Sequence, residues 1–330
     1  FCKFTLLEPY KQLYYNILIY RTPLKIDHFM PGIPENGCGD ILMQTKVLPS
    51  FRLVNPEMFA TFVMVSFQKS PTNISNDMTK NLILAAAMLL AGGAVAAQPK
   101  VIAHRGYWTA PESAQNSIAS FTKADAIGVF GSEIDVWLTA DDKLIVNHDR
   151  IYKGTDVNME KATAKEITAI VLPNGENIPT FDAYLKLVAS KPDTRLILEM
   201  KSLSDYNRED LAAKKIVKQL KKYGVLDQTE IIAFSINACM AFKKLIPDTK
   251  IYYLNGDLAP KSIKKLGLAG IDYSMKVLRK NPEWVKQAHD LGLEVNVWTV
   301  DSEEDMKYFI GLGVDYITTD YPERLQALLK

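Results

Sequence analysis

Short apolar runs alternate from Val101 onward with longer amphipathic segments. Short apolar runs between polar turns indicate buried strands, whereas apolar residues recurring about every three or four positions indicate a helix. Nine runs are predicted as strands: Val101–His104, Ser132–Trp137, Leu144–His148, Leu196–Met200, Glu230–Phe234, Lys250–Leu254, Gly270–Tyr273, Glu294–Val300 and Asp315–Thr318. Helices are predicted between most of them, including Ser117–Ile127, Asp210–Tyr223, Pro282–Leu291, Ser302–Leu312 and Glu323–Leu329.

This alternation extends over roughly 230 residues, close to the size of a parallel barrel of about 250 residues. We therefore predict a single α/β domain, a (β/α)8 barrel of the TIM type. A doubly wound open sheet is the alternative, and it is less favoured because no glycine-rich dinucleotide turn follows the first strand. The stretch Ile151–Pro179, after the third strand-like run, is predicted to be a small lid.

Nine predicted strands are one more than an eight-stranded barrel contains, so one of them must lie outside the barrel wall. Asp141–Asp142 lies midway between Asp135 and His148, so a hairpin turning there would place Asp135 opposite His148. We predict that Leu138–Thr139 and Leu144–Val146 form a hairpin that rises above the barrel rim. The alternative is an ordinary parallel strand that follows an extended descent.

Residues 78–97 have the pattern of a secretory signal peptide, which predicts a secreted or periplasmic protein. Lys80 gives a positive start, Leu82–Val95 is apolar, and Ala94–Ala97 supplies small residues for cleavage. The alternative is a buried core helix. No cysteine follows the small residues, so the sequence indicates no stable membrane anchor, and the barrel domain is expected over residues 98–330.

A signal peptide belongs at the start of a chain, yet 77 residues precede this one. We expect that residues 1–77 are not part of the natural protein and that translation begins at Met78. The alternative is a genuine extension. Only Cys239 remains beyond that segment, so no intrachain disulfide is expected there and the fold must rely on its core.

The formal net charge is +1, so nothing in the composition calls for nucleic acid as a partner. An anionic substrate would have to be held by local charges. Because the active sites of such barrels lie at the carboxyl ends of the strands, residues at those ends are the candidates. They are His104, Arg105, Glu133, Asp135, His148, Glu199, Lys201 and Trp298.

Glu133, Asp135 and Glu199 are hard oxygen donors within apolar runs, a set that suits Mg²⁺ or Ca²⁺. Taken singly, each could instead be a solvated or ion-paired side chain, with Lys201 as the partner of Glu199. Together they favour a cation site.

Positive charge beside such a cation would suit an anionic centre, most simply phosphate. Arg105 can bind two phosphate oxygens at once, whereas Lys201 acts as a point charge. Ordinary ion pairing at the barrel rim is the alternative. His104 and His148 could take and give protons on opposite sides of a phosphodiester.

Several segments, in order, resemble the glycerophosphodiester phosphodiesterase family. The resemblance rests on Val101–Gly106, Gln115–Phe121, Glu133–Val136, Val146–Asp149, Glu199–Lys201, Val297–Val300 and Gly313–Pro322. It covers essentially all of the chain from Val101 onward, and it is specific because the motifs occur in sequence.

The resemblance implies a TIM barrel with one divalent cation, Mg²⁺ or Ca²⁺, and a small glycerophosphodiester as substrate. The implied roles are acid/base catalysis by His104 and His148, metal binding by Glu133, Asp135 and Glu199, phosphate contacts by Arg105 and Lys201, and a glycerol-facing wall formed by Trp298. The nucleophile, either water or the neighbouring glycerol hydroxyl, the preferred alcohol and the oligomeric state stay open.

Two features depart from the family pattern. Gln115 stands where the family usually has a glutamate, so a metal role there is in doubt, and Tyr107–Trp108 adds aromatic surface at the mouth. A phospholipase C-like or sphingomyelinase D-like enzyme acting on membrane lipids is the alternative function. A binding protein without catalysis is a third.

Overall fold

The computed structural model describes residues 44–46, 64–66 and 98–330. The chain divides into two compact units, Phe1–Gly93 and Ala94–Lys330. In the first, β1 (Gln44–Lys46) pairs with β2 (Met64–Ser66) in antiparallel register. The predicted signal peptide and the rest of the predicted extension lie outside the described residues.

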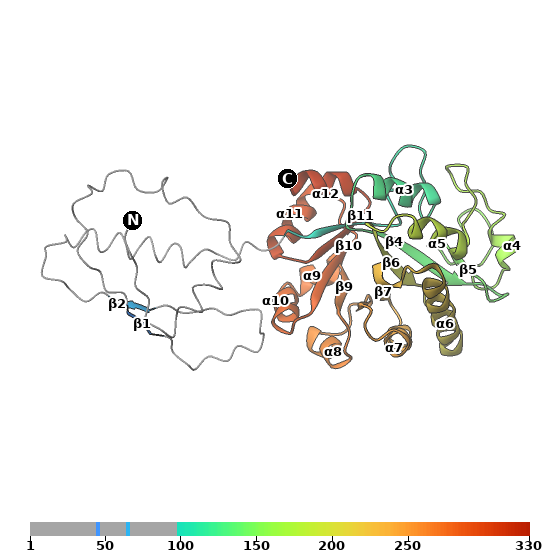
Figure 1. The fold of residues 1–330 in the computed structure, drawn as a ribbon. Helices are drawn as coiled ribbons and strands as arrows, with labels where there is room; N and C mark the ends of the chain where they lie inside the picture. Colours follow the sequence, from blue (N-terminus) through green and yellow to red (C-terminus); the bar gives the residue numbers. More distant parts are fainter. Residues whose placement is uncertain (1–43, 47–63, 67–97) are drawn as a thin grey trace, which may run out of the picture. The chain divides into compact units, whose positions relative to one another are not determined.

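Eight parallel strands of the second unit form a closed barrel (Figure 1). They are β3 (Lys100–Ala103), β4 (Gly131–Leu138), β6 (Arg195–Met200), β7 (Thr229–Ala233), β8 (Ile251–Tyr253), β9 (Gly270–Ser274), β10 (Glu294–Trp298) and β11 (Tyr316–Thr319). Pairing of β3 with both β11 and β4 closes the circle. The TIM-barrel prediction is confirmed, and the open-sheet alternative is wrong.

Helices cover the outside of this barrel (Figure 1). They are α3 (Ile118–Ala126), α5 (Phe181–Ala189), α6 (Tyr206–Tyr223), α7 (Ile236–Leu245), α8 (Pro260–Lys265), α9 (Met275–Lys280), α10 (Glu283–Asp290), α11 (Glu303–Leu312) and α12 (Pro322–Leu328), with a short 3₁₀ turn, η2 (Leu226–Gln228). Helix α6 begins before the predicted Asp210 because the Asp205 carboxylate accepts from the backbone N–H groups of Asn207 and Arg208. No helix in the part of the chain that the structure describes is long and apolar enough to span a bilayer.

Successive side chains along each strand point alternately outward, to the helices, and inward, to the interior of the barrel. Most buried residues lie between the strands and the helices. A smaller apolar cluster lies inside the barrel and includes Ile102, Ile197, Ile232, Tyr252, Leu254 and Tyr316. Inward-facing positions nearer the carboxyl ends of β4 and β6 are acidic instead, and this change from apolar to polar marks where the site begins.

The predicted hairpin is confirmed. Strand β5 (Leu144–Val146) is antiparallel to β4, and Val136 faces Val146. The expected register is wrong by one residue, because the backbone N–H of Asn147, not of His148, donates to the Asp135 carbonyl (3.0 Å). The observed turn contains one more residue than a turn centred on Asp141–Asp142 would contain. Asp142 lies in the left-handed region, with φ 57°.

The segment predicted as a lid, Ile151–Pro179, contains the short helix α4 (Ala164–Ile167) and has its own small core. This lid cluster consists of Trp137, Ile145, Met159, Ile167, Leu172, Ile178 and Ala114. Trp137 and Ile145 belong to the hairpin, so the lid segment packs against the strands that lead to His148. Glu176 in the lid also accepts from the backbone N–H groups of Ile118 and Ala119 and so caps α3.

Candidate active site

His104 directly follows β3. Its ring is held by an aspartate that lies near the C-terminal end of the chain. Its Nδ1 lies 2.7 Å from Oδ1 of Asp320, and the indole N–H of Trp108 donates to the same oxygen (2.9 Å). Burial acts to raise the pKa of Asp320, but these hydrogen bonds and the His104 charge outweigh it and lower the pKa. Asp320 is thus a candidate functional residue, although in the sequence it stands only within the family-like segment Gly313–Pro322, where it could simply cap the turn after the last strand.

His148 lies two residues beyond the end of β5 and lines a cavity together with His104. Its ring is half-buried, and Nδ1 lies 2.7 Å from Oδ1 of Asp149. Burial lowers the pKa of His148, with the positive charges of Lys201 and Arg105 adding to the effect and Asp135 opposing it. A neutral imidazole is therefore favoured near neutral pH.

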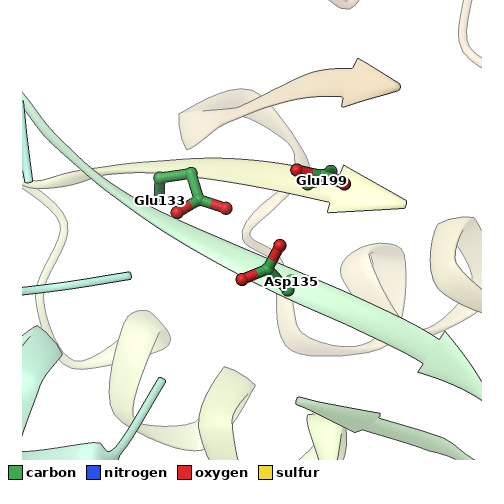
Figure 2. A group of neighbouring side chains, drawn as sticks. All are labelled: Glu133, Asp135 and Glu199. Atoms are coloured by element: carbon green, nitrogen blue, oxygen red, sulfur yellow. The ribbon is translucent and has the colours of Figure 1, made fainter. Parts of the chain in front are cut away.

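The three predicted ligands lie together. Asp135 on β4 is the strand partner of Glu199 on β6, and one oxygen from each of Glu133, Asp135 and Glu199 lies within 4.8 Å of the others (Figure 2). All three side chains are buried. Lys201 bonds two of them, with Nζ 2.7 Å from Glu199 Oε1 and 3.1 Å from Asp135 Oδ1.

Three carboxylates in so small a buried volume affect one another's ionisation. Burial raises the pKa of Glu133 well above its usual value and that of Glu199 to about 7, and repulsion from Asp135 adds to both. Burial acts in the same direction on Asp135, but Lys201, His148 and Arg105 reverse it, and the pKa of Asp135 is lowered.

The donor set fits a hard divalent cation. Oε1 of Glu133 is buried and finds no hydrogen-bond donor among residues 98–330. Bringing a charged oxygen out of water without a partner is costly, and a cation would supply that partner. The group holds only carboxylates, which favours Mg²⁺ or Ca²⁺ over softer metals.

Asn116 positions one of these carboxylates. Its Nδ2 donates to Asp135 Oδ2 (2.8 Å), while its Oδ1 accepts from the backbone N–H of Asp135 (3.1 Å). The residue is buried and has φ 60°. The sequence analysis quoted it within a family-like segment but assigned it no role, since its contact spans 19 residues of sequence.

Arg105 lies in a tight turn that directs its backbone N–H toward the carboxylates. With φ 55°, its backbone N–H donates to Glu133 Oε2 (2.7 Å), and its Nη1 donates to Gln115 Oε1 (2.7 Å). The next residue, Gly106, has φ 76°, and a Cβ there would lie 2.3 Å from Ser120 Oγ. Gln115 therefore contacts Arg105, and it is not among the clustered carboxylates.

A small cavity of about 90 Å³ joins these groups. Its polar side is formed by His104, Arg105, Glu133, His148 and Glu199, and its apolar side by Ile232, Phe234, Leu254 and Trp298. Asp135 and Lys201 do not line it directly but bond the residues that do. The ring of Trp298 packs edge-on against Phe234 at 5.7 Å between centroids, and its indole N–H donates to the Asp272 carbonyl (2.9 Å).

Asp272 also lines this cavity, and the sequence analysis missed it. Its side chain is 1% exposed. Burial raises its pKa to about 7, and the charges of Glu199 and Glu230 contribute to the rise. A single aspartate inside an apolar strand, Gly270–Ser274, was the available signal.

Fold and cavity together define a barrel protein whose acidic and basic side chains line one small cavity. Residues 104–324 match the model of the glycerophosphoryl diester phosphodiesterase family. The chain belongs to this family and is a phosphoric diester hydrolase, which confirms the resemblance of its motifs.

Individual relatives agree with this assignment. A glycerophosphodiester phosphodiesterase of Caldanaerobacter subterraneus subsp. tengcongensis is 32% identical over 247 residues, 70% of this chain and 97% of that protein. A glycerophosphodiester phosphodiesterase of Bacillus altitudinis is 29% identical over 241 residues, which are 68% of this chain and 96% of that protein. The crystal structure of a glycerophosphodiester phosphodiesterase from Parabacteroides distasonis superposes with a TM-score of 0.68 at 44% identity, covering 70% of this chain and 97% of that one.

Proposed function

We propose that this enzyme hydrolyses glycerophosphodiesters to glycerol phosphate and an alcohol, using one divalent cation and the acid/base pair His104 and His148. The observation that carries the proposal is the shared cavity, which brings both histidines to the buried carboxylate group. The names of the relatives support the substrate class.

Glu133, Asp135 and Glu199 would hold the cation, which when bound neutralises buried negative charge and polarises the phosphate oxygens. Arg105 lies beside them with its guanidinium oriented by Gln115. We assign it to the phosphate because its planar group can bind two oxygens. Lys201 does not line the cavity, so it would act on the phosphate from a distance, through the positive charge that it brings to Asp135 and Glu199.

The two histidines differ in their partners, which suggests a division of roles. The low pKa of His148 suits a base that accepts a proton from the nucleophile. His104 is held by the Asp320 carboxylate through Nδ1, which leaves its other ring nitrogen to act as the acid that protonates the leaving oxygen. Phosphorus NMR separates the two nucleophiles, because attack by the neighbouring glycerol hydroxyl passes through a cyclic phosphate and attack by water does not.

The test is a panel of glycerophosphodiesters assayed for released glycerol phosphate before and after treatment with a chelator. We expect turnover that disappears with the chelator and returns with Mg²⁺ or Ca²⁺. Turnover that is unchanged by thorough metal removal would contradict the cation, and absence of turnover on every member of the panel would contradict the substrate class.

Membrane phospholipids are a less favoured substrate. Such an enzyme needs apolar side chains free to enter lipid near its mouth. The two aromatic side chains near the mouth that could enter lipid are held by hydrogen bonds. The Tyr107 hydroxyl donates to Glu323 (2.8 Å), and the Trp108 indole N–H donates to Asp320. Binding to phospholipid vesicles, with lipid cleavage, would reverse this preference.

We also propose that residues 78–97 are a signal peptide and that the enzyme acts outside the cytoplasm. Support comes from Lys80, the apolar run Leu82–Val95 and the small residues that follow. N-terminal sequencing of exported protein should find a start near Gln98. A mature start before Met78 would contradict the signal peptide.

A further inference from the structure

Asp272 faces the metal-binding carboxylates across the barrel. In the closed strand order, β9 lies four places from β4 in either direction, so Asp272 is on the wall opposite Glu133 and Asp135. Its side chain nevertheless lines the same cavity as His104 and Glu199. A ligand with its phosphate near the carboxylates would therefore extend its other end towards Asp272.

One oxygen of this carboxyl has no partner. Asp272 Oδ1 is fully buried and forms no hydrogen bond with any residue in the described range 98–330. The neighbouring Asn296 amide acts to lower the pKa of this carboxyl through a hydrogen bond, but its groups are shared: Nδ2 also donates to Thr318 Oγ1 (2.8 Å), and Oδ1 accepts from the backbone N–H of Val297 (2.9 Å). Because an unsatisfied buried polar group is costly, a carboxyl that lacks a partner for one oxygen and belongs to a residue lining a cavity points to a ligand.

The surroundings of that oxygen indicate what the ligand carries. Trp298 is fixed beside it by the hydrogen bond to the Asp272 carbonyl, and Phe234 and Leu254 continue the apolar wall. Carbon–hydrogen groups pack against such a wall, while a hydroxyl group can reach the carboxyl at its foot. The complementary group is a short polyol chain.

We propose that the Asp272 carboxyl binds the terminal hydroxyl of the glycerol moiety, the one farther from the phosphate. This inference rests on the proposed function and deepens it. It makes Asp272 a specificity-determining residue that selects phosphodiesters of glycerol over phosphodiesters of alcohols that lack this hydroxyl.

The experiment compares two synthetic substrates with the same 4-nitrophenol leaving group. One is the 4-nitrophenyl ester of glycerol 3-phosphate, and the other lacks only the terminal hydroxyl but keeps the hydroxyl next to the phosphate. A hydrogen bond to a charged group stabilises by about 1.5–3 kcal/mol. Above about pH 8, where the Asp272 carboxyl with its pKa of about 7 is ionised, wild-type kcat/KM should therefore favour the glycerol ester by about 10- to 100-fold. This comparison needs no variant.

Asp272→Ala should lower kcat/KM for the glycerol ester to the level of the truncated ester, whose own value should not change. Asp272→Asn, which keeps a hydrogen-bonding group of the same shape, should retain part of the preference. Asp290→Asn on the exposed face of α10 is the matched control, since Asp290 bonds only Lys286 within the described part of the chain, and it should leave both substrates unchanged.

Equal losses on both substrates would overturn the proposal, because they would mean that Asp272 acts on the reaction centre or on the fold. A weakened affinity for Mg²⁺ or Ca²⁺ in Asp272→Asn would also overturn it by making Asp272 part of the cation site. Failure of the proposed function looks different: wild-type enzyme would then cleave bis(4-nitrophenyl) phosphate but neither ester.

Discussion

At the residue scale, the arrangement around His104 depends on one carboxylate. Asp320 accepts from both the imidazole and the Trp108 indole, and its own backbone N–H donates to Asp301 Oδ1 (2.9 Å). The imidazole therefore has one fixed orientation before any substrate binds. If His104 is catalytic, as proposed, a fixed ring reduces the reorganisation that the reaction requires.

Asp320→Ala should therefore lower kcat by about 10- to 100-fold while changing KM little, because the acid would be present but poorly oriented. Steady-state kinetics on a glycerophosphodiester measures both constants. Glu323→Ala is the control, since it removes the partner of Tyr107 at the mouth without touching His104. An unchanged kcat in Asp320→Ala would show that His104 needs no partner.

At the element scale, the hairpin β4–β5 and the lid segment determine where His148 lies. Ile145 is fully buried in the lid cluster and pairs with Trp137 across the hairpin. Trp137 lies two residues beyond Asp135 on β4, so the lid cluster packs on the same strand face that carries Asp135, further along the hairpin.

Ile145→Ala should destabilise the protein by about 2–4 kcal/mol through the cavity it leaves. We also expect a lower kcat, because the hairpin that leads to His148 loses support. Denaturant unfolding and kinetics measure the two effects. Ile151→Ala, at a position 52% exposed, should change stability by less than about 0.5 kcal/mol, and equal costs at the two positions would contradict the lid core.

The periodicity of apolar residues and the positions of the strand ends were sufficient to predict the barrel, the residues at the barrel rim and the extra hairpin. They were insufficient where a contact joins distant parts of the chain: His104 and Asp320 are 216 residues apart, and neither residue's neighbours signal the other. The hairpin register was missed because a left-handed residue, Asp142, lengthens the turn by one. Asp272 was missed because a lone aspartate in a strand is compatible with many roles.

At the scale of the whole molecule, the buried carboxylates couple stability to pH, and the proposed cation would change that coupling. The usual glutamate pKa of 4.5 rises to about 7 at Glu199 in the folded protein. The folded state therefore keeps its proton when the unfolded state has lost it, and stability falls as pH increases between these two values. A cation bound by Glu133, Asp135 and Glu199 would offset that loss.

Saturating Mg²⁺ or Ca²⁺ should accordingly raise the melting temperature by about 5–10 °C at pH 8 and by much less at pH 5, where Glu133 and Glu199 hold protons. Differential scanning calorimetry at both pH values measures this. Glu199→Gln should remove most of the increment at pH 8. A cation effect of the same size at both pH values would contradict binding at these carboxylates.

The central claim is that two histidines facing one cation site carry out the hydrolysis. The most direct test is single-turnover release of glycerol phosphate by His104→Ala, His148→Ala and, as a matched control, His289→Ala on the outer helix α10, where His289 contacts Asp315. We predict that the first two lose turnover by at least about 100-fold with unchanged melting temperatures, while the control keeps it. Near-normal release by either His104→Ala or His148→Ala would contradict the account.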